Sequence, residues 1–313
     1  MDGQLRHERR RRAAGRHGGS RRSARPAGMI ERTCAFGDGG NLVGTFCVPE
    51  EGVPRADLGL VLFNAGFLHR VGPHRINVRM ARALAKRGIA SLRFDLAGQG
   101  DSEAPGRREY RQGAVADLAA AMSELGREAG VTRFVLFGFC SGGFHSYDAA
   151  QADDRIAGIL LYDAFAYRTL RTRLNRMLMV VRSKGWRGAF AGVLAALARA
   201  FRRGNDAAQP PSPEFFLSFK PPPRREFAAT AGALLDRGVK IGMIYSGSFP
   251  RTINYEEQLR DALAGTRAAQ AISCRYFAGA DHTATTTAMQ AQLVRYVEEW
   301  VVELAARRRA ART

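Results

Sequence analysis

The stretch RFVLFGFCSGGFHS, from Arg133 to Ser146, decides the fold predicted for this 313-residue chain. It opens with an apolar run, Phe134 to Phe137, which has the length of a strand buried on both faces. A glycine-rich turn then leads into a predicted helix. A strand, a glycine-flanked residue and a helix together form a nucleophile elbow, written G-x-S-x-G when the nucleophile is serine. Cys140 occupies the central position here, which predicts a thiol nucleophile.

The neighbours of Cys140 fit such a turn. Gly138 and Gly142 let the backbone pass without a Cβ atom in the way. The N–H of Ser141 would lie at a helix N-terminus, where the helix dipole favours negative charge. We therefore predict that this N–H donates to the oxyanion of a bound carbonyl group. Ser141 is one position past the centre of the motif. A G-x-S-x-G motif centred on Ser141 would need a glycine at position 139, where the sequence has Phe139.

The composition is ordinary for a globular protein except in its charge. Hydrophobic residues make up 46% of the chain, whose length suffices for a sizeable core. The net charge is +19, and arginine runs lie in residues 1–28 and 306–313. We interpret both ends as basic tails, the first as a disordered tail or the product of an upstream start codon, with Met29 the true start. A nucleic-acid or membrane-surface role for the first tail is the alternative.

The sequence predicts neither a membrane span nor a metal site. No apolar stretch reaches the roughly 18 residues that a transmembrane helix needs. The N-terminus lacks the apolar core of a secretory signal, although its Arg-rich, acid-poor composition resembles a transit peptide. Four cysteines, Cys34, Cys47, Cys140 and Cys274, form no C-x-x-C pair, so neither a zinc site nor a disulfide framework is predicted. We expect a reducing cytoplasmic location, which a catalytic thiol requires.

Predicted strands and helices alternate along most of the chain. Apolar runs predict strands at 30–36, 42–48, 58–63, 89–94, 134–137, 156–162, 239–245 and 272–277. Helical spacing of apolar residues follows several of them, and a closing helix carries one apolar face from Met289 to Leu304. This alternation predicts the α/β class with a mostly parallel, doubly wound sheet, whose ligands bind at the carboxyl ends of the strands.

The alternation breaks over residues 166–225. Two helical patterns and a proline-rich stretch occupy this region, which we predict to be a helical cap inserted between two parts of the core, 29–165 and 226–305. The first cap helix is rich in arginine: Arg168, Arg171, Arg173 and Arg176. These arginines indicate either a solvated helix face or an anionic substrate.

Acyl transfer also needs a base and a group that orients it. His282 lies on the loop between the last predicted strand and the closing helix, where the base is expected. The orienting acid is harder to place, because the loop after 239–245 reads Ser-Gly-Ser-Phe and contains no carboxylate. Asp163, directly after a predicted strand, is the preferred candidate. Glu256, Glu257 or no acid at all are the alternatives, since losing the orienting group lowers the rate without abolishing it.

The second oxyanion donor is expected on the loop after the strand at 58–63. That loop reads Asn-Ala-Gly-Phe, in which Gly66 lets the backbone come close and the N–H of Phe67 would point inward. A later loop, FDLAGQGDS, is rich in glycine but lacks the strand-anchored G-x-G-x-x-G of a dinucleotide site. We therefore predict no cofactor.

With these parts in place, residues 30–304 resemble the α/β-hydrolase superfamily. The matching segments are NAGFLHRVGPHR, FDLAGQGDS, GFCSGG and DHT, in the expected order. The chain looks most like a bacterial branch of serine-aminopeptidase-like hydrolases found with exopolysaccharide or exosortase systems, and its elbow cysteine resembles that of dienelactone hydrolases. The resemblance implies an α/β-hydrolase fold, with Cys140 as nucleophile, His282 as base, and the amides of Phe67 and Ser141 as oxyanion donors.

We therefore predict a thiol hydrolase or acyltransferase that acts on a small-molecule ester, thioester or amide. Cys140, His282 and Asp163 would carry the reaction, and both a protonated histidine and a helix N-terminus lower the pKa of a thiol. One alternative is a catalytically inactive small-molecule binding protein that has kept the fold and lost the acid. Another is a basic protein associated with nucleic acid or polysaccharide. The tails hold much of the excess charge, so we predict no specific nucleic-acid partner.

Overall fold

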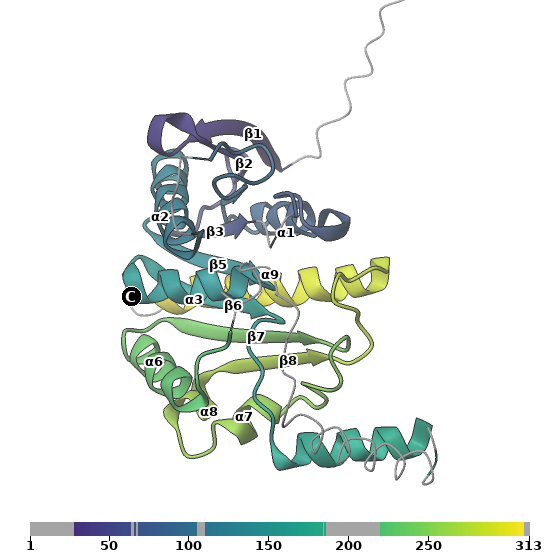
Figure 1. Cartoon of the computed structure of the whole chain (residues 1–313). Coiled ribbons are helices and arrows are strands. Elements are labelled where there is room, and N and C mark those ends of the chain that lie inside the picture. Colours follow the sequence, from purple (N-terminus) through teal and green to yellow (C-terminus); the bar gives the residue numbers. More distant parts are fainter. Residues whose placement is uncertain are drawn as a thin grey trace, which may run out of the picture.

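The computed structural model describes residues 28–63, 66, 68–104, 110–183, 185 and 220–309. Within these residues, eight strands form one sheet in the order β1-β2-β4-β3-β5-β6-β7-β8 (Figure 1). The strands are β1 (Met29–Phe36), β2 (Leu42–Pro49), β3 (Leu58–Phe63), β4 (Ser91–Phe94), β5 (Arg133–Phe139), β6 (Ile156–Tyr162), β7 (Lys240–Ser246) and β8 (Ser273–Phe277).

The sheet is parallel except at one edge. Strands β1 and β2 form an antiparallel hairpin, and β2 also pairs antiparallel with β4, whereas every pairing from β4 to β8 is parallel. The prediction of a mostly parallel, doubly wound sheet is therefore confirmed. Strand β3 lies between β4 and β5. The crossover from β3 to β4 therefore runs one way along the sheet, and the crossover from β4 to β5 runs the other way. Ligands bind at such a switch point in open α/β sheets, just beyond the carboxyl ends of the strands.

Helices cover both faces of the sheet (Figure 1). They are α1 (Ile76–Ala85), α2 (Tyr110–Ala129), α3 (Gly142–Ala152), α6 (Arg224–Asp236), α7 (Gln258–Ala262), α8 (Arg267–Ala271) and α9 (Thr287–Arg309), with short 3-10 turns at Asp38–Gly40 and Pro73–Arg75. Helices α1 and α9 pack on one face, and α2, α3 and α6 pack on the other.

Strand β3 shows why the central strands are continuous apolar runs. All six of its residues are buried. Leu58, Leu60 and Leu62 pack in the core beneath α1 and α9, whereas Val61 and Phe63 pack in the core on the opposite face. Successive side chains of a strand point to opposite faces, so a strand covered on both sides has no polar position.

Part of the predicted cap lies within the described residues. A helix over residues 170–183 follows β6, whereas 186–219 lies outside the described residues. Of the predicted tails at 1–28 and 306–313, residues 1–27 and 310–313 also lie outside them, and residues 306–309 belong to α9. The cap boundaries therefore stay a prediction. Among the described helices, none combines the length and the apolar character that a membrane-spanning segment requires.

Candidate active site

Cys140 sits on a strained turn between β5 and α3. Its φ angle is 51°, in the left-handed region that residues with a Cβ atom rarely adopt. Two main-chain hydrogen bonds hold this conformation: the Cys140 N–H donates to the carbonyl oxygen of Tyr162 over 2.8 Å, and the N–H of Gly143 donates to that of Cys140 over 3.0 Å. Ser141 is the N-cap residue of α3. The predicted elbow geometry is thus present, with Cys140 at its centre.

Asp163 and His282 lie together beside this turn. The two atoms His282 Nδ1 and Asp163 Oδ2 are 2.8 Å apart. Asp163 is the first residue after β6, and its side chain is only 1% exposed. Ser246, at the end of β7, holds the carboxylate: its N–H donates to Oδ1 over 2.7 Å and its hydroxyl donates to Oδ2 over 2.6 Å. The carboxylate is therefore fixed in the orientation that receives the N–H of the imidazole.

The His282 ring is hydrogen-bonded to Asp163, and the Cys140 side chain lies near enough to influence its protonation. Burial lowers the pKa of His282, but the hydrogen bond to Asp163, the neighbouring Cys140 side chain and the negative charge near the ring outweigh burial and raise the pKa to about 9. The rings of Phe139 and Phe249 flank the imidazole at centroid distances of 5.0 and 5.2 Å. The surroundings of His282 therefore favour the protonated imidazolium form.

The alternative acids lie elsewhere. Glu256 pairs with Arg275 over 3.7 Å, and Glu257 pairs with Arg171 over 3.5 Å. Of the carboxylates in the described residues, Asp163 is the one hydrogen-bonded to the His282 ring. The sequence placed Asp163 first among several options, and the structure brings it to the imidazole.

The predicted oxyanion donors are described only in part. Phe67 lies outside the described residues, so its proposed role stays a prediction. Gly66, just before it, has a φ of 54° and donates its N–H to Ser141 Oγ over 2.9 Å. The Ser141 side chain therefore ties the loop after β3 to the elbow, a contact that the sequence does not indicate because the two residues are 75 positions apart.

A buried arginine braces the same loop. The Arg70 side chain donates to Asp95 over 2.5 Å and to Asp101 over 2.6 Å, and the Arg70 N–H donates to Asp95 over 2.6 Å. Asp95 is fully buried and follows β4. His69, Asp95 and Asp101 lie close enough together to suggest a metal site. The Arg70 guanidinium contacts all three and already supplies the positive charge there. The sequence gives no signal for this pairing, because the two partners lie on separate loops.

Replacing Arg70 by methionine is expected to lower the free energy of unfolding by about 3–5 kcal/mol, because Asp95 would be left buried without its counter-charge. Urea denaturation measures this loss. Asp101→Asn is the matched control and should change stability by less than about 1 kcal/mol, since Asp101 is exposed and exposed ion pairs contribute little. Equal losses for the two variants would contradict the bracing role of the buried pair.

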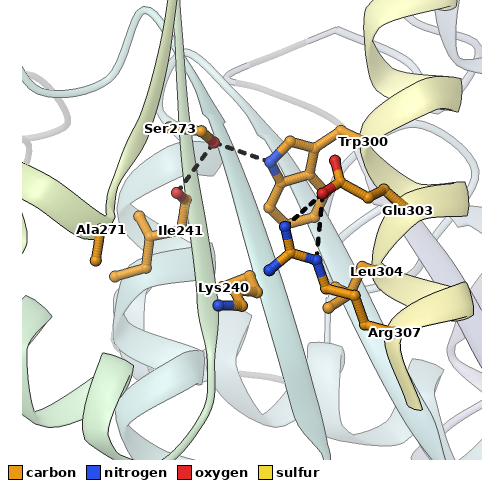
Figure 2. Close-up of a pocket in the computed structure, with 8 residues that line it drawn as sticks. All are labelled: Lys240, Ile241, Ala271, Ser273, Trp300, Glu303, Leu304 and Arg307. Atoms are coloured by element: carbon orange, nitrogen blue, oxygen red, sulfur yellow. Dashed lines mark hydrogen bonds and ion pairs between the residues drawn. The ribbon is translucent and has the colours of Figure 1, made fainter. Parts of the chain in front are cut away.

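A pocket of about 140 Å³ lies between the first residues of β7 and β8 and the helix α9 (Figure 2). Lys240 and Ser273, the first residues of β7 and β8, line it together with Trp300. The indole N–H of Trp300 donates to Ser273 Oγ over 2.9 Å. The pocket therefore opens at the amino ends of the strands, opposite the edge where Cys140 and Asp163 lie, and is separate from the candidate active site.

A mostly parallel eight-stranded sheet, an elbow after β5 and a histidine on the loop after β8 define an α/β-hydrolase fold. Sequence comparison supports the same assignment. The model of the Alpha/beta hydrolase family matches residues 60–313, and the chain belongs to this family. A search of the curated proteins gives no match.

Solved structures share the fold at low sequence identity. A serine hydrolase without a lid from Xanthomonas campestris is 16% identical, with a TM-score of 0.51, and the match covers 91% of this chain and 96% of that one. An esterase from Pyrococcus furiosus is 13% identical, with a TM-score of 0.52 and coverage of 87% and 92%. A dienelactone hydrolase-like promiscuous phosphotriesterase from metagenomic libraries is 15% identical, with a TM-score of 0.51 and coverage of 88% and 99%.

Proposed function

We propose that the chain is a thiol-dependent acyl hydrolase or acyltransferase, with Cys140 as nucleophile, His282 as acid and base, and Asp163 as the orienting group. The observation that carries the proposal is the grouping of Cys140, on a strained elbow, with a His282 ring that is hydrogen-bonded to the buried Asp163 carboxylate. A nucleophile, a base and an orienting group within hydrogen-bond reach are the requirements for covalent acyl transfer.

The substrate would be an ester, thioester or amide. The Cys140 sulfur attacks the carbonyl carbon. The Ser141 N–H would stabilise the oxyanion, together with the Phe67 N–H that the sequence implies as the second donor. The bond to the leaving group then breaks, and the leaving atom takes a proton from His282. Water attacks the resulting thioester while His282 accepts a proton, and the acid product leaves as the carbon–sulfur bond breaks. An alcohol or amine in place of water would give acyl transfer instead.

The raised pKa of His282, to which Cys140 itself contributes, is compatible with a thiol at this position. An imidazolium cannot accept a proton from a hydroxyl group, but it can stand beside a thiolate and later protonate the leaving group. The family and the solved structures support hydrolase chemistry in general, and several of those structures are serine hydrolases or esterases. The use of a thiol, the cytoplasmic location and the narrower resemblance to exosortase-associated hydrolases are parts of the proposal.

The alternative of an inactive binding protein depended on the loss of the acid. Asp163 contacts His282 with good geometry and is itself held by Ser246. A binding protein has no need for an acid fixed so firmly against an imidazole. We therefore favour the enzyme.

The proposal is tested by exposing the protein to short-chain p-nitrophenyl esters and to iodoacetamide, followed by intact-protein mass spectrometry. An acyl or alkyl adduct on the wild type, lost in Cys140→Ala and slowed in His282→Ala, is the expected result. If Cys140 is labelled at the rate of an ordinary free thiol, and this rate is the same in His282→Ala, the enzyme proposal is wrong. The chain would then be a binding protein with a hydrolase fold.

The rate should fall on the alkaline side of about pH 9. A raised pKa keeps His282 charged below that pH, and above it the imidazole loses the proton that the leaving group needs. In Asp163→Asn the hydrogen bond to a charged carboxylate is lost, so the pKa of His282 should fall and the alkaline limb should move to lower pH. The profile of kcat/KM against pH, recorded for the wild type and for Asp163→Asn, measures the alkaline limb of each protein. A rate that keeps rising through pH 9 in the wild type would argue for a neutral histidine base.

A further inference from the structure

The helix over residues 170–183 has one face attached to the body of the protein. Thr172 is buried, and its carbonyl oxygen accepts a hydrogen bond from Asn254 over 3.1 Å. Asn254 also pairs with Asn175 over 3.1 Å, and the Arg171 guanidinium lies 4.2 Å from the centroid of the Tyr255 ring. These contacts with the segment after β7 fix which side of the helix faces the body of the protein and which side faces away.

The side that faces away is apolar. Leu170, Leu174, Met177 and Leu178 are 80%, 50%, 55% and 44% exposed. Their spacing of i, i+4, i+7 and i+8 places them along one stripe of the helix, roughly opposite Thr172 and Asn175. Figure 1 shows this helix, in teal below α7, standing clear of the sheet. Isolated exposed apolar side chains are ordinary, but four on one stripe mark an interaction surface.

The flanks of the stripe are basic. Arg173 and Arg182 lie at its two edges and are exposed, Arg176 is exposed farther round the helix, and the helix contains no acidic residue. The sequence in fact has no aspartate or glutamate between Asp163 and Asp206. An apolar stripe bordered by arginines is the pattern of a helix that lies in the interface of an anionic bilayer, where the apolar side chains enter the acyl boundary and the arginines meet the headgroups.

We propose that the helix over residues 170–183 docks the protein on the surface of an anionic lipid membrane. The charge selects this partner over the others. A second copy of the chain would bring two sets of arginines together, which is unfavourable. A nucleic acid would satisfy the arginines but leave the leucines in water. An anionic bilayer satisfies both. The helix follows β6 and Asp163 at the carboxyl edge of the sheet, so docking would bring the edge that carries Cys140 toward the lipid.

Co-sedimentation of the full chain with vesicles tests this inference. We expect binding to mixed phosphatidylglycerol and phosphatidylcholine vesicles, weak binding to phosphatidylcholine alone, and weakening at high salt. The double variant Leu174→Glu/Met177→Glu should lose at least about tenfold in affinity, because two apolar side chains would no longer be buried and two like charges would face the lipid. Met179→Glu is the matched control, because Met179 lies on the side of the helix nearer the body, and it should bind like the wild type.

A second full-length variant separates the helix from the basic tail. Replacing the arginines from Arg9 to Arg12, with Arg21 and Arg22, by serine should leave most of the vesicle binding intact. Binding that disappears in this tail variant, or that survives in the double helix variant, would overturn the inference. So would a lower melting temperature in the double variant with unchanged vesicle binding, which would assign the stripe to contacts within the chain. Self-association of the wild type that the double variant abolishes, without vesicle binding, would assign the stripe to a second copy.

Discussion

Cys140→Ala is expected to lower kcat/KM for ester hydrolysis by about a thousandfold or more, because removing the nucleophile of a catalytic triad costs that much in related chemistry. The fold should survive the change, since the alanine keeps the Cβ atom and the side chain is only half-buried. Cys140→Ser should lose roughly a hundredfold, because the hydroxyl needs a neutral histidine and His282 stays largely protonated near Asp163. Steady-state kinetics and thermal melts of the three proteins measure both effects.

The other cysteines provide the control. Burial raises the pKa of the Cys34 thiol to about 11 and those of Cys47 and Cys274 to about 12. These thiols should therefore react slowly with iodoacetamide at neutral pH. Cys274→Ala should keep both the rapid labelling and the activity of the wild type. Loss of activity in Cys274→Ala, or full activity in Cys140→Ala, would contradict the assignment of the nucleophile.

The elements that could be predicted from the sequence are those with a local cause. Phe134 to Phe137 reads as a buried strand because every position is apolar, and the structure buries all four. Gly138 marks the turn because a Cβ atom there would meet the backbone of Gly142 and Gly143. His282 is found by its position after the last strand. Each of these inferences needs only a few neighbouring residues.

The parts that could not be predicted depend on distant segments. Asp163 was one of several candidates, because only the pairing of β6 with β7 brings it within reach of Ser246 and of the loop that carries His282. Arg70 and Asp95 lie on different loops, and nothing near either residue marks it as buried and paired. The hydrogen bond from Gly66 to Ser141 likewise joins two segments that are far apart in the chain.

The positions of Cys140 and Asp163 share a backbone feature. Both follow a central strand directly, and both have a φ near 50°. The N–H of Asp163 donates to the carbonyl oxygen of Ile244 in β7, and that of Cys140 donates to Tyr162 in β6, so the neighbouring strand holds each strained residue. Strain of this kind persists only where the surrounding structure imposes it, and it concentrates at functional sites. The carboxyl ends of β5 and β6 therefore position Cys140 and Asp163 by the same device.

Gly138→Ala is expected to disable the site without touching any residue that takes part in the chemistry. A Cβ atom at Gly138 would lie 2.4 Å from the carbonyl oxygen of Gly142 and 2.6 Å from the Cα atom of Gly143, both of which are backbone atoms of the first turn of α3. The helix must therefore move away from β5, and the elbow moves with it. Overpacking of this kind lowers the free energy of unfolding by about 1–3 kcal/mol. A displacement of about 1 Å at the reacting atoms lowers kcat by roughly a hundredfold.

Gly232→Ala is the matched control for this variant. Gly232 lies inside α6, and a Cβ atom there meets no atom within 4 Å. Alanine should therefore raise the free energy of unfolding by up to about 1 kcal/mol through its better helix propensity, with activity unchanged. Urea denaturation and the rate of Cys140 alkylation by iodoacetamide should be measured on both variants. A Gly138→Ala protein that alkylates at the wild-type rate would show that the elbow tolerates the methyl group, and that the close approach of β5 and α3 is not what places the thiol beside His282.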